Sequence, residues 1–190
     1  GFDPAPLLAS VFPGGFSPEG ITLTAEYVSC APEGFQLNIA PSGIRISCGD
    51  GAGFFYALGV LVQLAAQAGG TLPCAEIADE PVLSVRGIML DIGRDKIPSM
   101  ETLRRLIDLF ASMRINHLQM YMEGFSFDYE DFHYLFTNET PMTPAEFREL
   151  SLYARAHFID LVPNQNVLGH MEKWLEKPQF RSLAECEDGY

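Results

Sequence analysis

Three apolar runs that alternate with two amphipathic segments constrain the fold of residues 85–163 more than any other feature. The runs are VRGIMLDI (85–92), INHLQMYM (115–122) and IDLVP (159–163). The first is almost continuously apolar, which is typical of a strand that a parallel sheet buries on both faces. The alternation predicts a βαβαβ arrangement, in which strands connected through helices pair in parallel.

The two amphipathic segments carry helix start signals. Ser99 is a predicted N-cap, and Thr143, Pro144 and Glu146 form a predicted N-cap, first helical residue and capping box. Apolar residues recur at helical spacing in the first segment. They are Leu103, Leu106, Ile107, Phe110 and Met113.

The N-terminal part has a different pattern. FQLNIA (35–40) and IRISC (44–48) flank a Pro-Ser-Gly turn and predict a hairpin. Asp50 is a predicted N-cap for an apolar helix that begins near Phe54. Because the composition changes at ADEP (78–81), we predict an α/β chain with a small α+β domain over 1–80 and a parallel α/β domain over 81–190.

Polar residues cluster just after the predicted parallel strands. In such sheets the carboxyl ends of the strands lie at one edge, where ligands bind. Amide side chains suit hydroxyl-rich ligands because each donates and accepts hydrogen bonds. The residues expected at this edge are Asp91, Arg94, Glu123, Asn164, Asn166 and His170.

Charge and composition exclude several classes of function. A formal net charge of −13 repels phosphate backbones, so we expect no nucleic-acid partner.

The four cysteines form no CxxC pair and have no histidine at zinc-ligand spacing, so we expect no metal site; they leave the redox compartment open. No signal peptide or transmembrane segment is visible, and the long apolar stretch from Phe54 is too short to span a bilayer, so we expect no membrane partner and leave the localisation open.

Several of these segments resemble glycoside hydrolase family 20, the β-N-acetylhexosaminidases. VRGIMLDIGRD resembles the first barrel strand, ending in Asp-x-x-Arg, and LFASMRINHLQMYM resembles the first barrel helix and second strand. ELSLYARAHFIDLVPNQNVLGH resembles the stretch that ends in Pro-Glu-x-Asp-x-Pro-Gly-His. The front segment is similar to the small α+β domain before the barrel. The resemblance implies that residues 81–190 form the first three β/α units of a TIM-type (β/α)8 barrel.

The resemblance also implies a chemistry. These enzymes remove terminal β-linked N-acetylhexosamine (GlcNAc or GalNAc) without a cofactor, and the substrate's own N-acetyl group attacks the anomeric carbon. Their catalytic Asp-Glu pair follows the fourth barrel strand. We therefore expect no catalytic residue in this chain and no activity of the chain alone.

Roles for individual residues follow from the same resemblance. Arg86 is expected to bind sugar hydroxyls, although an arginine at a strand end also pairs readily with a carboxylate. Asp91 and Arg94 match Asp-x-x-Arg and are expected to bind the substrate; the equal alternative is a mutual ion pair that holds the loop. His170 is expected to support catalysis through an acid from the second strand, for which Glu123 is the candidate, with a register open by one residue; the alternative for His170 is a surface loop.

Asn164 and Asn166 stand where the family pattern has Glu and Asp, and we expect them near the sugar as amides. This departure leaves two other functions open: a non-catalytic carbohydrate-binding or interaction module with the same fold, and a different βα enzyme. The expected partners are a carbohydrate with terminal N-acetylhexosamine and either the remainder of the barrel or a second copy paired through open sheet edges.

Overall fold

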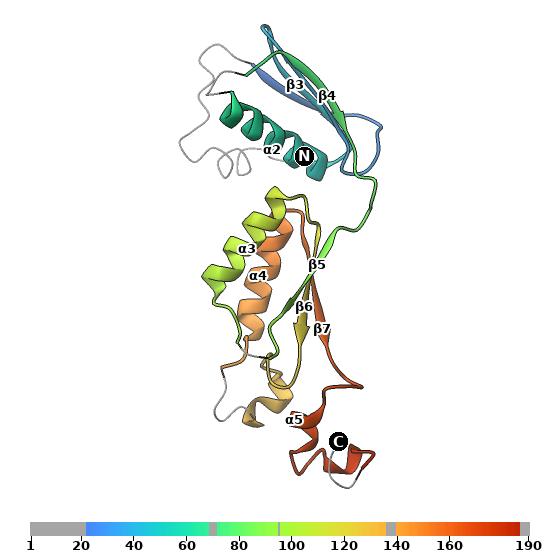
Figure 1. The fold of residues 1–190 in the computed structure, drawn as a ribbon, viewed down its shortest axis with the longest axis vertical. Helices are drawn as coiled ribbons and strands as arrows, with labels where there is room; N and C mark the ends of the chain where they lie inside the picture. Colours follow the sequence, from blue (N-terminus) through green and yellow to red (C-terminus); the bar gives the residue numbers. More distant parts are fainter. Residues whose placement is uncertain (1–21, 69–71, 95, 136–139, 187–190) are drawn as a thin grey trace. The chain divides into compact units, whose positions relative to one another are not determined.

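The computed structural model describes residues 22–68, 72–94, 96–135 and 140–186. The chain divides into two compact units between Ser84 and Val85 (Figure 1). The first unit contains the predicted hairpin, and the second contains the predicted parallel strands.

The first unit is a four-stranded mixed sheet backed by one helix. Its elements are β1 (Leu23–Tyr27), β2 (Phe35–Ala40), β3 (Gly43–Cys48), α2 (Gly51–Gln67) and β4 (Ala75–Asp79). The strand order is β1-β3-β2-β4, with β1 parallel to β3 and β2 antiparallel to both β3 and β4. The predicted hairpin is confirmed as β2 and β3, whereas the sequence did not predict β4.

Alternation in β2 and β3 builds the core of this unit. Every second residue of the two strands is buried and faces α2. These residues are Phe35, Leu37, Ile39, Ile44, Ile46 and Cys48. Asp50 is the N-cap, as predicted: its carboxylate accepts from Gly53 N and from Glu33 N, each at 2.8 Å. The cap starts α2 at Gly51, three residues before the predicted start.

The second unit is a parallel sheet with helices on one face (Figure 1). Its strands are β5 (Gly87–Asp91), β6 (His117–Met122) and β7 (Asp160–Gln165), in the order β5-β6-β7. The helices are α3 (Met100–Ser112) and α4 (Pro144–Ala156), and the shorter elements are η1 (Glu130–Leu135), α5 (Glu172–Leu175) and η2 (Arg181–Leu183). The predicted α/β class and the parallel pairing are confirmed.

Both predicted caps of the second unit are present. Ser99 Oγ accepts from Thr102 N at 3.3 Å, and α3 begins at the next residue. Thr143 Oγ1 accepts from Glu146 N at 3.2 Å, while the Glu146 carboxylate accepts from Thr143 N at 2.9 Å. This reciprocal pair and Pro144 fix the start of α4.

The third parallel strand does not end at Pro163, as the sequence predicted, but continues to Gln165. Asp160 N and Asn166 N donate to carbonyls of β6 and of the residue before it, so even-numbered residues of β7 face β6. By alternation, the Pro163 nitrogen lies on the side of β7 away from β6, where no donor is required.

The two faces of β6 differ in burial. Leu118, Met120 and Met122 are at most 2% exposed and lie in the core under the helices. Gln119 and Tyr121 lie on the opposite face and are half-buried. Polar side chains on this second face are therefore free to serve a site. In the described part of the chain, no helix has the length and apolar character needed to cross a membrane.

Candidate functional site

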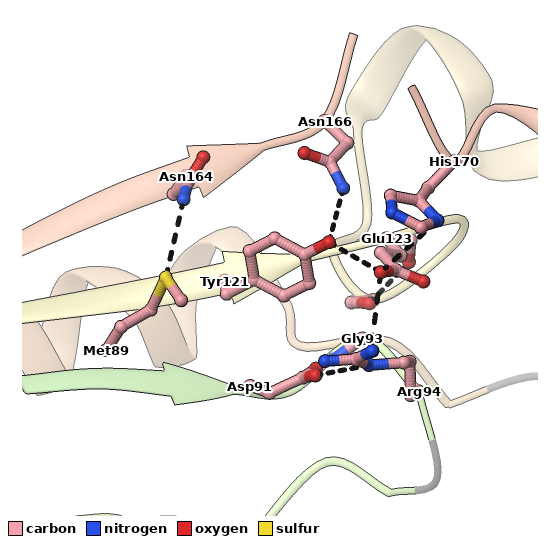
Figure 2. A network of polar contacts seen from close by, with 10 residues as sticks. Met89, Asp91, Gly93, Arg94, Tyr121, Glu123, Asn164, Asn166 and His170 are labelled. Atoms are coloured by element: carbon pink, nitrogen blue, oxygen red, sulfur yellow. Dashed lines mark hydrogen bonds and ion pairs between the residues drawn. The ribbon is translucent and has the colours of Figure 1, made fainter. Parts of the chain in front are cut away.

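The strand register brings one row of polar residues together at the carboxyl end of the sheet. Asp91 pairs with Tyr121, and Tyr121 pairs with Asn164, across β5, β6 and β7. The loops that follow add Arg94, Glu123 and further residues of the β7 loop to the same region (Figure 2). Six of the seven residues predicted for the site lie at this end: Asp91, Arg94, Glu123, Asn164, Asn166 and His170.

Glu123 is the centre of the network. Its Oε1 accepts from the Tyr121 hydroxyl at 2.5 Å and lies 3.9 Å from Arg94 Nε and 3.8 Å from His170 Nδ1. The Glu123 side chain is 15% exposed, whereas those of Arg94 and His170 are 63% and 59% exposed. A shielded carboxylate therefore lies between two side chains that solvent or a ligand can reach.

Asp91 holds Arg94 in place. Its Oδ2 accepts from Arg94 Nε at 2.5 Å, and its Oδ1 accepts from Gly93 N at 2.8 Å. Partial burial by itself raises the pKa of Asp91, but the Gly93 hydrogen bond and the Arg94 guanidinium outweigh it, so the net pKa is lowered. The same ion pair raises the pKa of Arg94. Both groups are charged at neutral pH, and the expected mutual ion pair is present.

Two glycines flank Glu123 and allow close contacts of the loops around it. A Cβ on Gly93 would lie 2.3 Å from Glu123 N, inside any normal contact distance. Gly124 has φ +52, a conformation that favours glycine, and its carbonyl accepts from Trp174 Nε1 at 3.0 Å. Trp174 is 7% exposed and packs edge-on against Phe125, so it supports this turn from the core.

His170 is held by an unusual backbone conformation. Its φ is +54, which is uncommon for a residue with a side chain. The ring approaches Glu123 from the loop after β7 (Figure 2). The sequence left two alternatives for His170, a surface loop or a position next to a carboxylate. Both are present, because the side chain is exposed and also lies near Glu123.

The two asparagines after Pro163 differ in their contacts. Asn166 Nδ2 donates to the Tyr121 hydroxyl oxygen at 2.6 Å and thereby joins the Glu123 network. Asn164 Nδ2 faces the Met89 sulfur at 3.9 Å on the same face of the sheet (Figure 2). Asn166 is thus tied to the carboxylate centre, while Asn164 lies beside it.

The expected position of Arg86 in this pocket is wrong. Arg86 precedes β5, and its Nε donates to the Arg114 carbonyl at 2.7 Å. Its backbone exchanges hydrogen bonds with Asn116, which precedes β6. In a parallel sheet both neighbours mark the amino end, and the five residues of β5 separate Arg86 from the site by roughly 17 Å.

Tyr121 lies in this network, but it was not predicted from the sequence as a site residue. The signal was available, because Tyr121 and Glu123 are two residues apart and side chains alternate along a strand. A tyrosine in an apolar run is usually a packing residue, however, and only the structure shows that its hydroxyl has two polar partners.

A cleft of about 800 Å³ adjoins the network and shares Arg94 with it. Its walls come from the loops after β5 and β6 and from the first residues of α3 and α4. Within the described ranges, no three His, Cys, Asp or Glu side chains gather in a way that could hold a metal ion.

Comparison with known families gives two matches that follow the division of the chain. Residues 11–80 match "Glycosyl hydrolase family 20, domain 2". Residues 84–188 match "Glycosyl hydrolase family 20, catalytic domain". The second match alone covers more than half of the chain.

Individual relatives are similar but longer. A beta-hexosaminidase of Akkermansia muciniphila is 28% identical over 158 residues, which cover 73% of this chain and 32% of that protein. The crystal structure of a beta-N-acetylhexosaminidase from Bacteroides fragilis aligns with a TM-score of 0.77 at 24% identity, covering 96% of this chain and 42% of that chain. A mutant Streptomyces plicatus beta-hexosaminidase in complex with the product GlcNAc aligns with a TM-score of 0.73 at 24% identity, over 88% of this chain and 40% of that chain. The chain spans about a third of the length of the first curated relative.

Proposed function

Because this chain belongs to glycosyl hydrolase family 20, we propose that it forms the first part of a sugar-binding site in an enzyme that removes terminal β-linked N-acetylhexosamine. One observation carries the proposal: two exposed side chains, Arg94 and His170, lie on either side of the shielded Glu123 carboxylate, at the carboxyl ends of three parallel strands. The fold alone would not support it, since similar barrels serve many reactions.

Arg94 is the proposed contact to sugar hydroxyls. A guanidinium can donate to two neighbouring hydroxyls at once, and the Arg94 side chain is 63% exposed while Asp91 holds its Nε. Asn164 and Asn166 add amide groups at the same edge. We therefore assign to Arg94 the sugar-binding role that the sequence suggested for Arg86, because Arg94 lies at the carboxyl end of the sheet.

Glu123 and His170 are the proposed supporting pair. A carboxylate near an imidazole fixes the orientation of its ring. In the proposed reaction the acetamido group of the substrate is the nucleophile, and the proton donor and its aspartate partner come from sequence outside residues 1–190. The chain then contributes binding and orientation rather than the acid itself.

A non-catalytic carbohydrate-binding module is the second candidate. It is favoured by Asn164 and Asn166, which stand where the resemblance implied carboxylates and so reduce the negative charge around the site. The two candidates differ in one outcome: a binding module retains sugar affinity but shows no turnover in the protein as its gene encodes it.

Substitution of the two arginines tests the proposal. In the protein as its gene encodes it, Arg94→Ala should lower kcat/KM for an aryl β-N-acetylglucosaminide by roughly ten- to a hundredfold, because a lost charged donor costs about 1.5–3 kcal/mol. Arg86→Ala is the matched control: it removes the same side chain at the other end of β5, so kcat/KM of the folded variant should stay within about threefold. Equal losses in both variants would refute the role of Arg94.

A further inference from the structure

Tyr121 has the shortest contact to the Glu123 carboxylate in the network. The hydroxyl lies 2.5 Å from Glu123 Oε1, while Arg94 Nε and His170 Nδ1 lie 3.9 Å and 3.8 Å from the same oxygen. The tyrosine is held by β6, whose opposite face is fully buried under α3 and α4. A residue of the central strand therefore makes the short contact that holds this carboxylate oxygen.

The protons available at the tyrosine restrict what its second partner can be. A phenol has one proton to donate, and an ionised carboxylate can only accept. Once the proton points to Glu123, the hydroxyl oxygen can only accept from its other neighbour. Asn166 Nδ2, at 2.6 Å, supplies that donor. A carboxylate at position 166 would compete with Glu123 for the same proton.

The other contacts of the network are consistent with hydrogen bonds that run from Asn166 to Tyr121 and from Tyr121 to Glu123. Arg94 is tied to Asp91 at 2.5 Å, and its guanidinium carbon lies 5.7 Å from the centre of the Tyr121 ring. His170 is 59% exposed and reaches Glu123 only at 3.8 Å. Neither group replaces the tyrosine at short range, and both keep surface for a ligand.

We propose that Tyr121 is a positioning residue that aims Glu123 at His170, and that Asn166 determines the direction of the Tyr121 hydroxyl proton. Residues 121 and 166 then form a matched pair: an amide is required at 166 because a tyrosine stands at 121. The catalytic meaning of this pair rests on the proposed function, but the hydrogen-bond order can be tested without a substrate.

The first test follows the ionisation of Tyr121 in the protein as its gene encodes it. Tyrosine labelled with ¹³C at Cζ is titrated by NMR, and Tyr121→Phe identifies the signal. The pKa of Tyr121 should be raised, chiefly because its hydroxyl donates to Glu123. Glu123→Gln should lower the pKa of Tyr121, and Asn166→Asp should raise it further because the donor is lost and a negative charge is added.

Asn164→Asp is the charge control for this titration. It adds the same charge at the register partner of Tyr121, whose amide contacts Met89 and not the hydroxyl, so its effect on the pKa of Tyr121 should be smaller than that of Asn166→Asp. An ordinary tyrosine titration in the unsubstituted protein, or equal shifts from the two aspartates, would overturn the proposal.

The second test is a double-mutant cycle on kcat/KM. Asn166→Asp should lower kcat/KM by about tenfold or more when Tyr121 is present, and by less than about threefold in a Tyr121→Phe background. Independent effects of the two substitutions would overturn the coupling. Complete absence of hexosaminidase activity in the unsubstituted protein would instead refute the proposed function, and the titration would still decide the hydrogen-bond order.

Discussion

Gly93 shows how one missing atom shapes the site. An added Cβ would lie 2.3 Å from Glu123 N and 3.1 Å from Glu123 Cβ, so any side chain there would push the two loops apart. The nearest obstacle is backbone, which cannot rotate away as a side chain can. The close approach of the loop after β5 to the backbone of Glu123 therefore depends on glycine at this position.

Comparison of two glycine substitutions tests this interpretation. Gly93→Ala should destabilise the protein by about 1–3 kcal/mol, because overpacking forces backbone shifts. Gly59→Ala is the control: nothing lies within 4 Å of its Cβ in α2, so it should stabilise by about 0.5–1 kcal/mol. Urea unfolding of both variants gives the two values, and a neutral Gly93→Ala would show that the loops adjust freely.

Single residues were predicted unevenly from the sequence. The location of four residues was predicted correctly because strand ends can be recognised and residues just after a parallel strand lie at its carboxyl end: Asp91, Arg94, Glu123 and His170. Arg86 was misplaced because a motif position, rather than its place before the strand, was used. Tyr121 was missed because an aromatic residue in an apolar run gives no sign of its hydroxyl contacts.

At the scale of elements, helix α4 illustrates local control by a cap. Hydrogen bonds from Thr143 N and Thr143 Oγ1 lower the pKa of Glu146 below its usual value of 4.5. A carboxyl group with a lowered folded-state pKa stabilises the fold above its unfolded pKa, and this stabilisation is lost as the pH falls through the folded value.

Glu146→Gln isolates this contribution, because glutamine keeps the shape of the capping box but not the charge. The unfolding free energy of the unsubstituted protein should exceed that of the variant above pH 4.5, and the difference should shrink as the pH falls below it. In a Thr143→Ala background the difference should be smaller at every pH, because one donor is gone. A difference independent of pH in chemical denaturation would contradict the assignment.

The elements with local signals were the ones predicted best. Ser99, Thr143 and Asp50 mark helix starts through contacts within three residues, so the caps were predicted and found. β4 was missed because its place in the sheet depends on pairing with β2, about forty residues earlier. The end of β7 was misplaced because a proline usually ends a strand, and only the sheet shows that its nitrogen needs no partner.

At the scale of the molecule, the parallel sheet of the second unit has two edges among the described residues, at β5 and at β7. Met89 on β5 is 59% exposed, and Val85 just before it is 62% exposed. Such edges and apolar side chains are sites for association with another chain or segment.

Residues 1–190 on their own should therefore self-associate and show no hydrolysis of an aryl β-N-acetylglucosaminide. Analytical ultracentrifugation over a range of concentrations, with the glycoside assay on the same samples, measures both properties. A monomer at high concentration would contradict the association, and measurable turnover would show that the catalytic acid lies within these residues.

Pro163 has a consequence for whatever strand adds to β7. The outer side of β7 presents an N–H at Leu161 and Gln165 but none at Pro163 between them. A partner strand that directs a carbonyl at this gap leaves an acceptor unpaired, which costs about 1–3 kcal/mol if it is buried. A partner strand avoids this cost if its register places a bulge or a water-exposed carbonyl opposite Pro163. A single proline thus restricts the register in which another strand can pair with β7, whether that strand belongs to the same polypeptide or to a second molecule.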